Sequence, residues 1–418
     1  MTNIVESVFM KKVLFSFALC LCAVCAVQGQ TIQLGDRFYD GFTLYTVREV
    51  RPGNIVYMSD ALGDEELTLE QWGDSPRCYR LLPSRNAEEP KYGAEFGCRV
   101  NYVCQPDNKY LEVIGDNDYS LQVLPLVQPM DEMAAGGLWY NGSLVYDARP
   151  DKDGSVRMTA MAEGEEHEFL LIPVGKGTDL FEVSGGPDGA VNVYDHAAYA
   201  RRIRQDGLDV ICFYDKLNRL TDVMQATQIW DAQELNVRQW MALLCGKYKT
   251  EGGADVVMEE SRFEYKGMEI PMKPVTFNGM ATGVLDFGDA GPFPTGLIEA
   301  VPTREGLLFT EVRMEDGAAW FERTVSCYAL EWAGGQSRFA FTRDILLIGV
   351  LHRCDKQLLR VMRNAILAAH GYVFRSKDLK TYFEAQPWYH PAANKAGIKL
   401  SLLEHLNIAL IQAAERRE

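Results

Sequence analysis

The feature that most constrains this chain is an internal repeat. Sliding the sequence by 101 residues aligns residues 38–70 with residues 139–171 without a gap. The identical pairs are mainly aromatic and turn-forming: Tyr39, Gly41, Tyr45, Gly53, Ala61, Gly63, Glu65 and Leu69 fall on Tyr140, Gly142, Tyr146, Gly154, Ala162, Gly164, Glu166 and Leu170. A fixed period of this length indicates two copies of one structural module, placed at about 33–130 and about 134–230.

Each copy has the pattern of a β-meander. Apolar and polar residues alternate, and turn residues interrupt the alternation at regular places. Asp40-Gly41 and the matching Asn141-Gly142 are strong short hairpin signals. We therefore expect both copies to be antiparallel and rich in short strands.

Two helices are expected near the end of the second copy. The first has Asp195 as its N-cap, residues 197–205 as its body and Gly207 as its stop. The second begins at Asp231, with Glu234 three residues later as in a capping box.

Residues 246–350 form a third β region, whose short strand-like runs are separated by glycine-containing turns. The pattern is typical of a small curled sheet or half-barrel. Below about eight strands such an interior is usually filled by side chains, so we favour a core over a ligand cavity. A carrier for an apolar ligand stays open as an option.

From about residue 351 the apolar period becomes helical. Asp355 caps a helix that ends near Gly371, Ser376 caps the next, and Ser401 with Glu404 forms a capping box for the last. The expected buried stripes are Leu358, Leu359, Met362, Ile366 and Ala369 in the first helix and Leu402, Leu406, Ala409 and Leu410 in the last.

Together these patterns predict an α+β protein. The expected domains are two β-rich repeats (30–130 and 131–245), a third β module (246–345) and a small helical module (346–418). The ordinary composition, with 47% apolar and 24% charged residues, excludes collagen, coiled-coil rods and wholesale disorder.

The N-terminus predicts export. Lys11 and Lys12 precede an uncharged apolar run, Val13–Val27, which is too short and wrongly flanked for a transmembrane helix. We expect residues 1–29 to be a signal peptide cleaved between Gly29 and Gln30, which leaves no transmembrane segment in the mature chain. The expected location is the periplasm or the cell surface.

Two alternatives concern this N-terminus. A lipoprotein is possible because Cys20, Cys22 and Cys25 lie in the apolar run, although Val24 stands where a small residue is usual before a lipidated cysteine. Met10 is an alternative start that would make the first nine residues an upstream extension.

The charge of the mature chain is uneven. Residues 30–342 carry 28 Lys/Arg and 50 Asp/Glu, whereas residues 343–418 carry 12 Lys/Arg and 7 Asp/Glu. An acidic body does not bind DNA or an anionic membrane through its overall field. The basic end is therefore the expected contact with an anionic partner, and no nucleic acid partner is expected.

Seven cysteines remain after the expected cleavage: Cys78, Cys98, Cys104, Cys212, Cys245, Cys327 and Cys354. The odd number and the lack of a CxxC pair favour buried thiols over a disulfide framework. If a bridge forms in the first module, Cys78 with Cys98 or Cys104 is the better candidate.

The C-terminal segment resembles the YARHG domain, a module of exported bacterial proteins. The matching residues are Arg363, Asn364, Ile366, Ala368, His370, Gly371, Tyr372, Phe374, Leu379, Tyr382, Phe383, Trp388, Tyr389, Pro391, Leu403, Glu404, Asn407 and Ile408. Leu367 and Ala369 stand where the naming motif has Tyr and Arg. The resemblance covers about 351–415 and implies an extracellular module of unestablished role.

The residues themselves allow two interpretations of this segment. Its aromatics are numerous enough to form the core of a small domain, and Asn364 and His370 are expected to hydrogen-bond the turn after Gly371. The functional alternative is a polar groove for an anionic polymer or peptide. Its candidate ligand-binding residues are Arg363, Asn364, His370, Tyr372, Trp388 and Tyr389.

No sequence motif assigns a catalytic residue, metal ligand or cofactor. The six histidines lack metal-ligand spacing, and no GxSxG, Walker A or GxGxxG motif opens a helix. We predict an exported cell-envelope binding or scaffold protein without catalytic activity, whose basic module contacts an anionic envelope polymer, peptide or envelope protein. The alternative is an envelope glycan or peptide hydrolase that uses carboxylates of the β modules.

Overall fold

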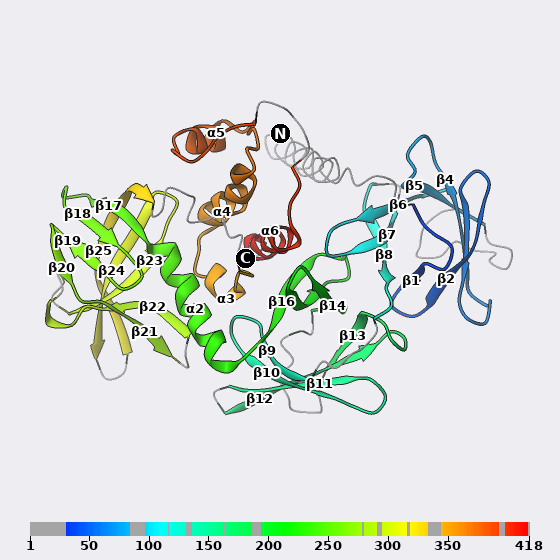
Figure 1. Ribbon diagram of the computed structural model, residues 1–418, viewed down its shortest axis with the longest axis horizontal. Helices are drawn as coiled ribbons and strands as arrows, with labels where there is room; N and C mark the ends of the chain where they lie inside the picture. Colours follow the sequence, from blue (N-terminus) through cyan, green and yellow to red (C-terminus); the bar gives the residue numbers. More distant parts are fainter. Residues whose placement is uncertain are drawn as a thin grey trace.

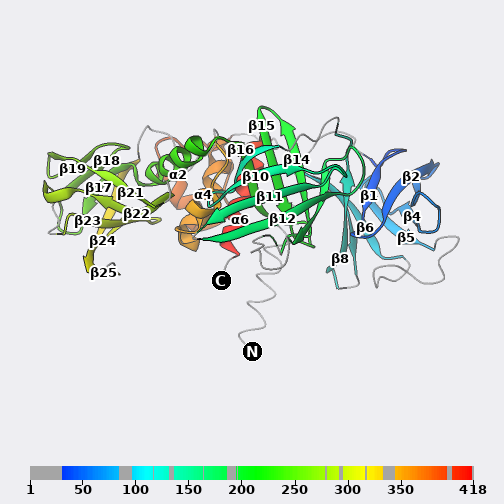
Figure 2. The ribbon, with the colours of Figure 1, turned by 90° about the horizontal axis from the view of Figure 1, so that it is seen from below.

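The computed structural model describes most of the chain after residue 30. The described residues are 31–83, 97–115, 117–130, 136–162, 164–185, 194, 196–277, 280–290, 295–315, 318–332, 344–392 and 398–416. The expected signal peptide, its cleavage site at Gly29 and Gln30 and the three cysteines of the apolar run lie outside the described residues. Two barrels and a curled sheet are arranged in a row, and the C-terminal helices lie between them (Figures 1 and 2).

The first copy of the repeat is a closed eight-stranded barrel. Its strands are β1 (Arg37–Tyr39), β2 (Leu44–Arg51), β3 (Ile55–Ser59), β4 (Glu66–Gln71), β5 (Cys78–Leu82), β6 (Arg99–Cys104), β7 (Lys109–Ile114) and β8 (Ser120–Val127). Closure occurs because β1 pairs with β2 on one side and with β8 on the other, where Phe38 lies opposite Leu126.

The second copy is also a closed barrel of eight strands. Its strands are β9 (Gly137–Tyr140), β10 (Val145–Pro150), β11 (Val156–Ala162), β12 (Glu165–Pro173), β13 (Leu180–Gly185), β14 (Tyr199–Gln205), β15 (Leu208–Tyr214) and β16 (Leu220–Thr227). Each strand follows its counterpart in the first barrel by about 100 residues. The predicted duplication of a β-rich module is therefore confirmed.

Side chains fill both barrels, as expected for this strand number. The first encloses a cluster that includes Phe38, Tyr45 and Tyr79, each at most 1% exposed. The second encloses packed rings, with Tyr194 stacked on Phe213 at 4.0 Å between ring centroids and Phe169 tilted against Tyr194 at 4.9 Å.

The helix predicted over residues 197–205 is wrong, because these residues contribute to strand β14. Asp206 and Gly207 both have positive φ, 55° and 83°, and they form the hairpin turn to β15 rather than a helix stop. The helix-favouring Ala and Arg residues are overridden because β14 must supply hydrogen bonds to both β13 and β15 for the barrel to close.

A long helix, α2 (Ile229–Leu244), leaves the second barrel. The predicted helix is present, but the predicted cap is wrong: Gln228 occupies the N-cap position and Asp231 lies in the first turn. The helix buries Trp240, Leu243 and Leu244 against the next module.

The third module is a nine-stranded antiparallel sheet with the order β20-β19-β18-β17-β25-β24-β23-β22-β21. Its strands are β17 (Gly246–Thr250), β18 (Asp255–Met258), β19 (Phe263–Tyr265), β20 (Met268–Ile270), β21 (Lys273–Phe277), β22 (Met280–Asp286), β23 (Leu297–Pro302), β24 (Gly306–Glu315) and β25 (Ala318–Trp332). The two edge strands are consecutive in the chain, so the sheet curls strongly, which agrees with the predicted half-barrel.

The chain ends in four helices among the residues described: α3 (Ile348–Leu351), α4 (Lys356–Ala369), α5 (Lys377–Glu384) and α6 (Leu402–Glu415). The Asp355 side chain caps α4 by accepting the Leu358 N–H, and Ser401 with Glu404 forms the predicted capping box of α6. Gly371 ends α4 with φ of 76°. One detail of the predicted stripe is wrong, since Ala369 is exposed and Ala368 is buried instead.

The helical module shares one apolar core with its neighbours. A single buried cluster runs from Tyr140 and Leu180 of the second barrel, through α2 and the curled sheet, to α3, α4 and α6. The segment before α3 is held from both sides, because Gln239 of α2 bonds Ile345 and Leu347 and Asn407 of α6 bonds Leu346. The C-terminal module is therefore a packed central part of the molecule rather than a separate tail (Figure 1).

Two further features bear on the sequence predictions. Cys78 is a free thiol, so its pairing with Cys98 or Cys104 does not form, and Cys212 is a buried thiol. Among the residues that the structure describes, no helix combines the length and the apolar character that crossing a bilayer requires. The α+β class and the order of modules are as predicted.

Candidate functional site

The predicted ligand-binding residues lie on α4 and its C-terminal end, in the loop before α5 and on the segment after α5, and several already bond within the chain. Arg363 of α4 forms an ion pair with Glu415 of α6 at 3.1 Å, and both side chains are at most 20% exposed. Asn364 is 1% exposed and donates to the Arg360 carbonyl at 2.7 Å in its own helix. The Arg363 ion pair therefore attaches α4 to α6, whereas the Asn364 bond stays within α4.

His370, at the end of α4, also contacts α6. Its Nε2 lies 2.7 Å from Oε1 of Glu404, the residue that completes the capping box of α6. Burial raises the pKa of Glu404, but hydrogen bonds from Ser401 and His370 outweigh it, so this pKa lies below its ordinary value. The predicted bonds from Asn364 and His370 to the turn after Gly371 are wrong, because both side chains have these other partners.

The remaining three predicted residues are aromatic and pack around α5. Tyr389 is 8% exposed, and its hydroxyl donates to the Tyr372 carbonyl at 2.7 Å. Trp388 packs edge-to-face on Phe383 of α5. Tyr372 and Trp388 are half-buried, so part of each ring stays on the surface. The six residues do not form one open groove, and their ligand-binding role stays a prediction.

Cations that the sequence analysis did not single out gather where α4 and α5 begin. Lys356, Arg375 and Lys377 are exposed; we call them the basic edge. Arg360, one turn after Lys356 on the same face of α4, pairs with Asp378, and this contact brings the two helix starts together. The Arg360 hydrogen bonds hold the pKa of Asp378 well below its ordinary value. A search for Lys and Arg beside the predicted helix caps Asp355 and Ser376 would have found these residues.

A buried polar cluster lies where α6 meets the two barrels. Asp107, in the turn between β6 and β7, accepts from the Tyr214 hydroxyl of the second barrel at 2.8 Å and lies 2.8 Å from Nε2 of His405 on α6. Asn108 bonds Asn218 across the same boundary at 2.6 Å. Burial raises the pKa of Asp107, but the charge and hydrogen bond of His405 outweigh it and hold the pKa below its ordinary value.

The cluster at Asp107 joins three modules but leaves no room for a substrate. Asp107 is 6% exposed, and its partner Tyr214 stacks on Tyr199 at 5.1 Å between ring centroids. A general base must come within hydrogen-bond reach of a substrate proton, which this burial prevents. We assign the cluster to docking of α6 on the barrels.

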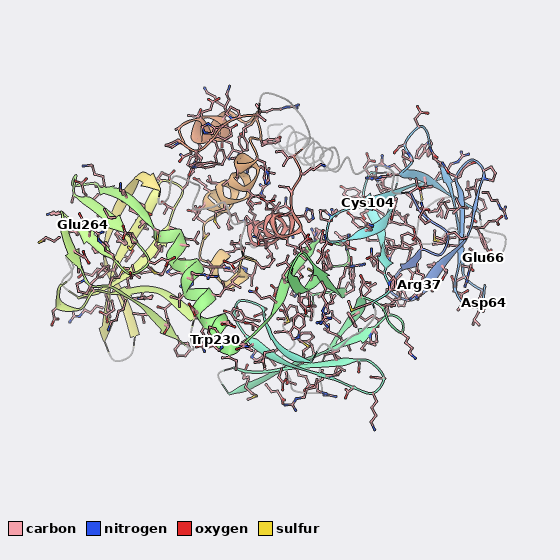
Figure 3. The ribbon with its side chains drawn as sticks, in the orientation of Figure 1. Arg37, Asp64, Glu66, Cys104, Trp230 and Glu264 are labelled. Atoms are coloured by element: carbon pink, nitrogen blue, oxygen red, sulfur yellow. The ribbon has the colours of Figure 1, made fainter. Side chains whose placement is uncertain are left out.

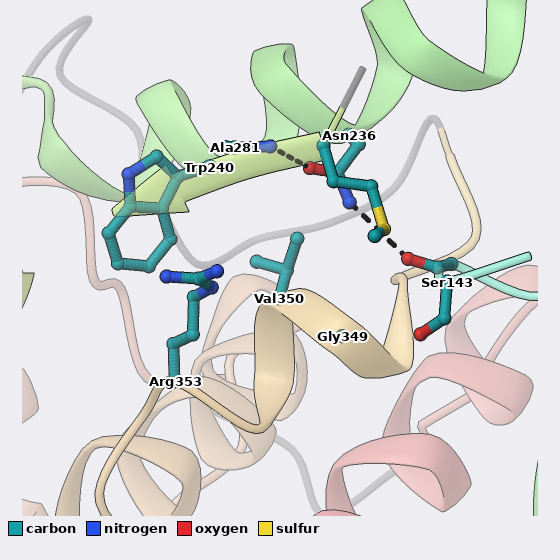
Figure 4. A pocket seen from close by; sticks show the side chains of 9 residues that line it. Ser143, Asn236, Trp240, Ala281, Gly349, Val350 and Arg353 are labelled. Atoms are coloured by element: carbon teal, nitrogen blue, oxygen red, sulfur yellow. Dashed lines mark hydrogen bonds between the residues drawn. The ribbon is translucent and has the colours of Figure 1, made fainter. Parts of the chain in front are cut away.

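A small pocket lies where the second barrel, α2, the curled sheet and α3 meet (Figure 4). Its volume is about 160 Å³, and it is lined by Gly142, Ser143, Asn236, Trp240, Met280, Ala281, Gly349, Val350 and Arg353. The Arg353 guanidinium lies over the Trp240 ring at 5.6 Å from its centroid and donates to the Thr282 carbonyl. Burial lowers the pKa of Arg353, an effect that Glu299 opposes.

The lining of this pocket suits an apolar or aromatic group. Trp240, Met280 and Val350 supply apolar surface, and Arg353 supplies a cation beside an aromatic face. The Asn236 amide oxygen is already bonded to Ala281 N at 2.8 Å. The sequence could not reveal this pocket, because its residues come from four separate elements.

Both repeats carry acidic residues beside their third strand-to-strand connection: Asp64, Glu65 and Glu66 lie where β4 begins, and Glu165 and Glu166 begin β12. Asp64 and Glu66 lie at the outer edge of the first barrel, far from the curled sheet (Figure 3). Their turn is closed by Asp60, whose Oδ1 accepts from the backbone of Gly63 and Asp64. Within the described part of the chain, no three His, Cys, Asp or Glu side chains are placed to hold a metal ion.

Comparison with known families assigns the C-terminal module to one of them. Residues 350–416 match the model of the YARHG domain, so the chain carries this domain and the resemblance in the sequence is confirmed. The YARHG domain is a predicted extracellular domain, which agrees with an exported protein. The search of curated proteins finds no match to this chain.

Proposed function

We propose that this chain is an exported cell-envelope protein that binds or scaffolds without catalysis, and that its YARHG domain contacts an anionic envelope polymer or peptide. The basic edge carries the proposal: Lys356, Arg375 and Lys377 are exposed on a chain whose preceding modules are strongly acidic. An anionic partner is attracted to this edge and repelled by the barrels, which orients the contact.

The packing of the domain supports placing the contact at the basic edge. Arg363 and His370 face carboxylates of α6, and Asn364 is buried, so these side chains hold the domain together. The starts of α4 and α5 lie away from that junction and remain open to a partner. The half-buried rings of Tyr372 and Trp388 add apolar surface on the same domain.

The proposal includes the location and the division of the chain. We propose cleavage between Gly29 and Gln30, release into the periplasm or to the cell surface, and module boundaries near residues 130, 245 and 345. Because the YARHG domain shares its core with the neighbouring modules, binding has to be tested on the whole mature chain.

Cosedimentation of the mature chain with purified anionic cell-wall polymer tests the function. We expect binding that salt weakens, and at least about fivefold weaker binding by the variant Lys356→Gln, Arg375→Gln, Lys377→Gln. The matched control, Lys152→Gln, Lys176→Gln, Lys216→Gln, removes the same charge from exposed sites on the second barrel and should bind normally. Equal losses in both variants, or no binding by the wild type, would contradict the proposal.

A further inference from the structure

The first turn of each barrel is built in the same way. In the first barrel, Oδ1 of Asp40 accepts from the backbone of Phe42 at 2.9 Å and of Thr43 at 2.7 Å. In the second, Oδ1 of Asn141 accepts from the backbone of Ser143 at 2.9 Å and of the next residue at 2.8 Å. Phe42 and Ser143 therefore occupy equivalent positions in the two turns.

The surroundings of these two turns differ completely. In the second barrel the turn packs on α3, and a Cβ atom at Gly142 would lie 3.1 Å from Leu347 and 3.2 Å from the Ile348 nitrogen. In the first barrel a Cβ atom at Gly41 would meet nothing within 4 Å. Phe42 is 96% exposed, more than any other large apolar side chain in the described residues.

Phe42 is part of a wider apolar rim. The turns that follow β1, β3 and β7 lie at the same end of an up-and-down barrel, and they carry Phe42, Leu62 and Tyr119. Leu62 is 84% exposed and Tyr119 is 62% exposed. Apolar groups gathered at one exposed end mark a contact surface rather than scattered surface residues.

The pocket beside Ser143 is of the right size for the Phe42 ring. Cavities of about 150 Å³ with apolar walls accept benzene, and this pocket measures about 160 Å³. The Trp240 ring and the Arg353 guanidinium offer stacking and cation–π contact to an entering phenyl group. Its wall is formed partly by the turn equivalent to the one that carries Phe42.

We propose that Phe42 of one molecule inserts into this pocket of a second copy of the chain, which joins the molecules head to tail. Charge complementarity favours a second copy: the turn that carries Leu62 also carries Asp64 and Glu65, whereas Arg353 is the charged residue that lines the pocket. The first barrel and the pocket lie in different parts of the row of modules, so a molecule cannot fill its own pocket (Figure 1). Such a heterologous contact builds open chains or closed rings.

Sedimentation velocity of the full mature chain tests the proposal. The wild type should form oligomers as its concentration rises, and Phe42→Ser, which installs the residue of the second barrel, should weaken association at least about tenfold. Met268→Ser, which removes another exposed apolar side chain on the curled sheet, is the matched control and should associate like the wild type.

A second variant tests the pocket itself. Ser143→Phe places a ring at the pocket from within the molecule and should also block association. A mixture of the two variants should form pairs and nothing larger, because Phe42→Ser keeps an intact pocket and Ser143→Phe keeps an intact Phe42. A monomeric wild type at all concentrations, or Phe42→Ser that associates like the wild type, would overturn the proposal.

The proposed association through Phe42 does not depend on the basic edge. Phe42→Ser should bind anionic polymer as single molecules do, and the triple variant of the basic edge should still associate. The two experiments can therefore fail independently.

Discussion

The two barrels have the same strand order and the same first turn, but only the second packs that turn against the rest of the molecule. Its turn at Gly142 packs against α3, and its last strands contact α6, where Arg416 donates to the Leu220 carbonyl at 3.0 Å. The first barrel docks through its buried turn at Asp107, whereas the turns that carry Phe42, Leu62 and Tyr119 stay exposed. The two barrels therefore share one fold. The helices that follow the second barrel in the chain bury its first turn and leave the equivalent turn of the first barrel exposed.

The boundary between the barrels should be the most sensitive region. Arg201 is 3% exposed, pairs with Asp179 and donates to the Leu126 carbonyl at the end of the first barrel. Arg201→Met leaves Asp179 buried without its partner, so we expect a loss of about 3–5 kcal/mol in the free energy of unfolding. Denaturant unfolding followed by fluorescence measures it.

The control for that change lies in the first barrel. Arg80 pairs with Glu70 on the barrel surface, where both side chains remain partly exposed to solvent. Arg80→Met should therefore cost no more than about 1 kcal/mol. Similar losses in the two variants would mean that burial does not distinguish these ion pairs.

The two turn glycines give a direct comparison of docked and exposed turns. Gly41 and Gly142 have φ of 99° and 95°, so alanine introduces the same backbone strain of about 1–2 kcal/mol at either position. At Gly142 the added methyl group also crowds Leu347, so we expect Gly142→Ala to cost at least about 1 kcal/mol more. Equal melting temperatures for the two variants would show that α3 does not press on this turn.

Acidification should weaken the docking of α6 before it unfolds the barrels. The folded pKa of Asp107 lies below its ordinary value, so its ionised form stabilises the fold above that ordinary value and the contribution is lost as the pH falls through the folded pKa. The melting temperature of the wild type should fall more between about pH 7 and about pH 3 than that of Asp107→Asn. Parallel pH profiles would contradict this role.

The smallest effect on stability is expected at the exposed turn. Phe42 contacts no surrounding core, so Phe42→Ser should change the free energy of unfolding by less than about 0.5 kcal/mol, measured at a concentration where the chain is monomeric. A larger loss would mean that this side chain supports the first barrel itself.

The sequence predicted the two repeated β-rich modules, but it did not show that each of them closes into a barrel. The repeat and the alternating residues indicated two β-meanders, but nothing local shows that β1 and β9 each pair with a strand about 90 residues later. The error at residues 197–205 has a related cause. The sixth strand of the first barrel lies at the equivalent position, so alignment of the copies would have predicted a strand where local helix propensity did not.

The candidate site shows the same division between local and distant information. Caps and turns, such as Asp355, Gly371 and the Ser401–Glu404 box, depend on neighbouring residues and were predicted from the sequence. The partners of Arg363 and His370 lie 52 and 34 residues away, and the sequence alone did not point to them.

By itself, the sequence determined the duplication, most of the strands and helices and the YARHG domain, because these depend on periodicity and on residues close together in the chain. Tertiary structure alone decided that the basic module packs at the centre, that Arg363 and His370 pair with carboxylates of α6, and that Phe42 and a fitting pocket remain open. Those properties arise where distant segments meet, and burial there determines which charges pair and which apolar groups stay exposed.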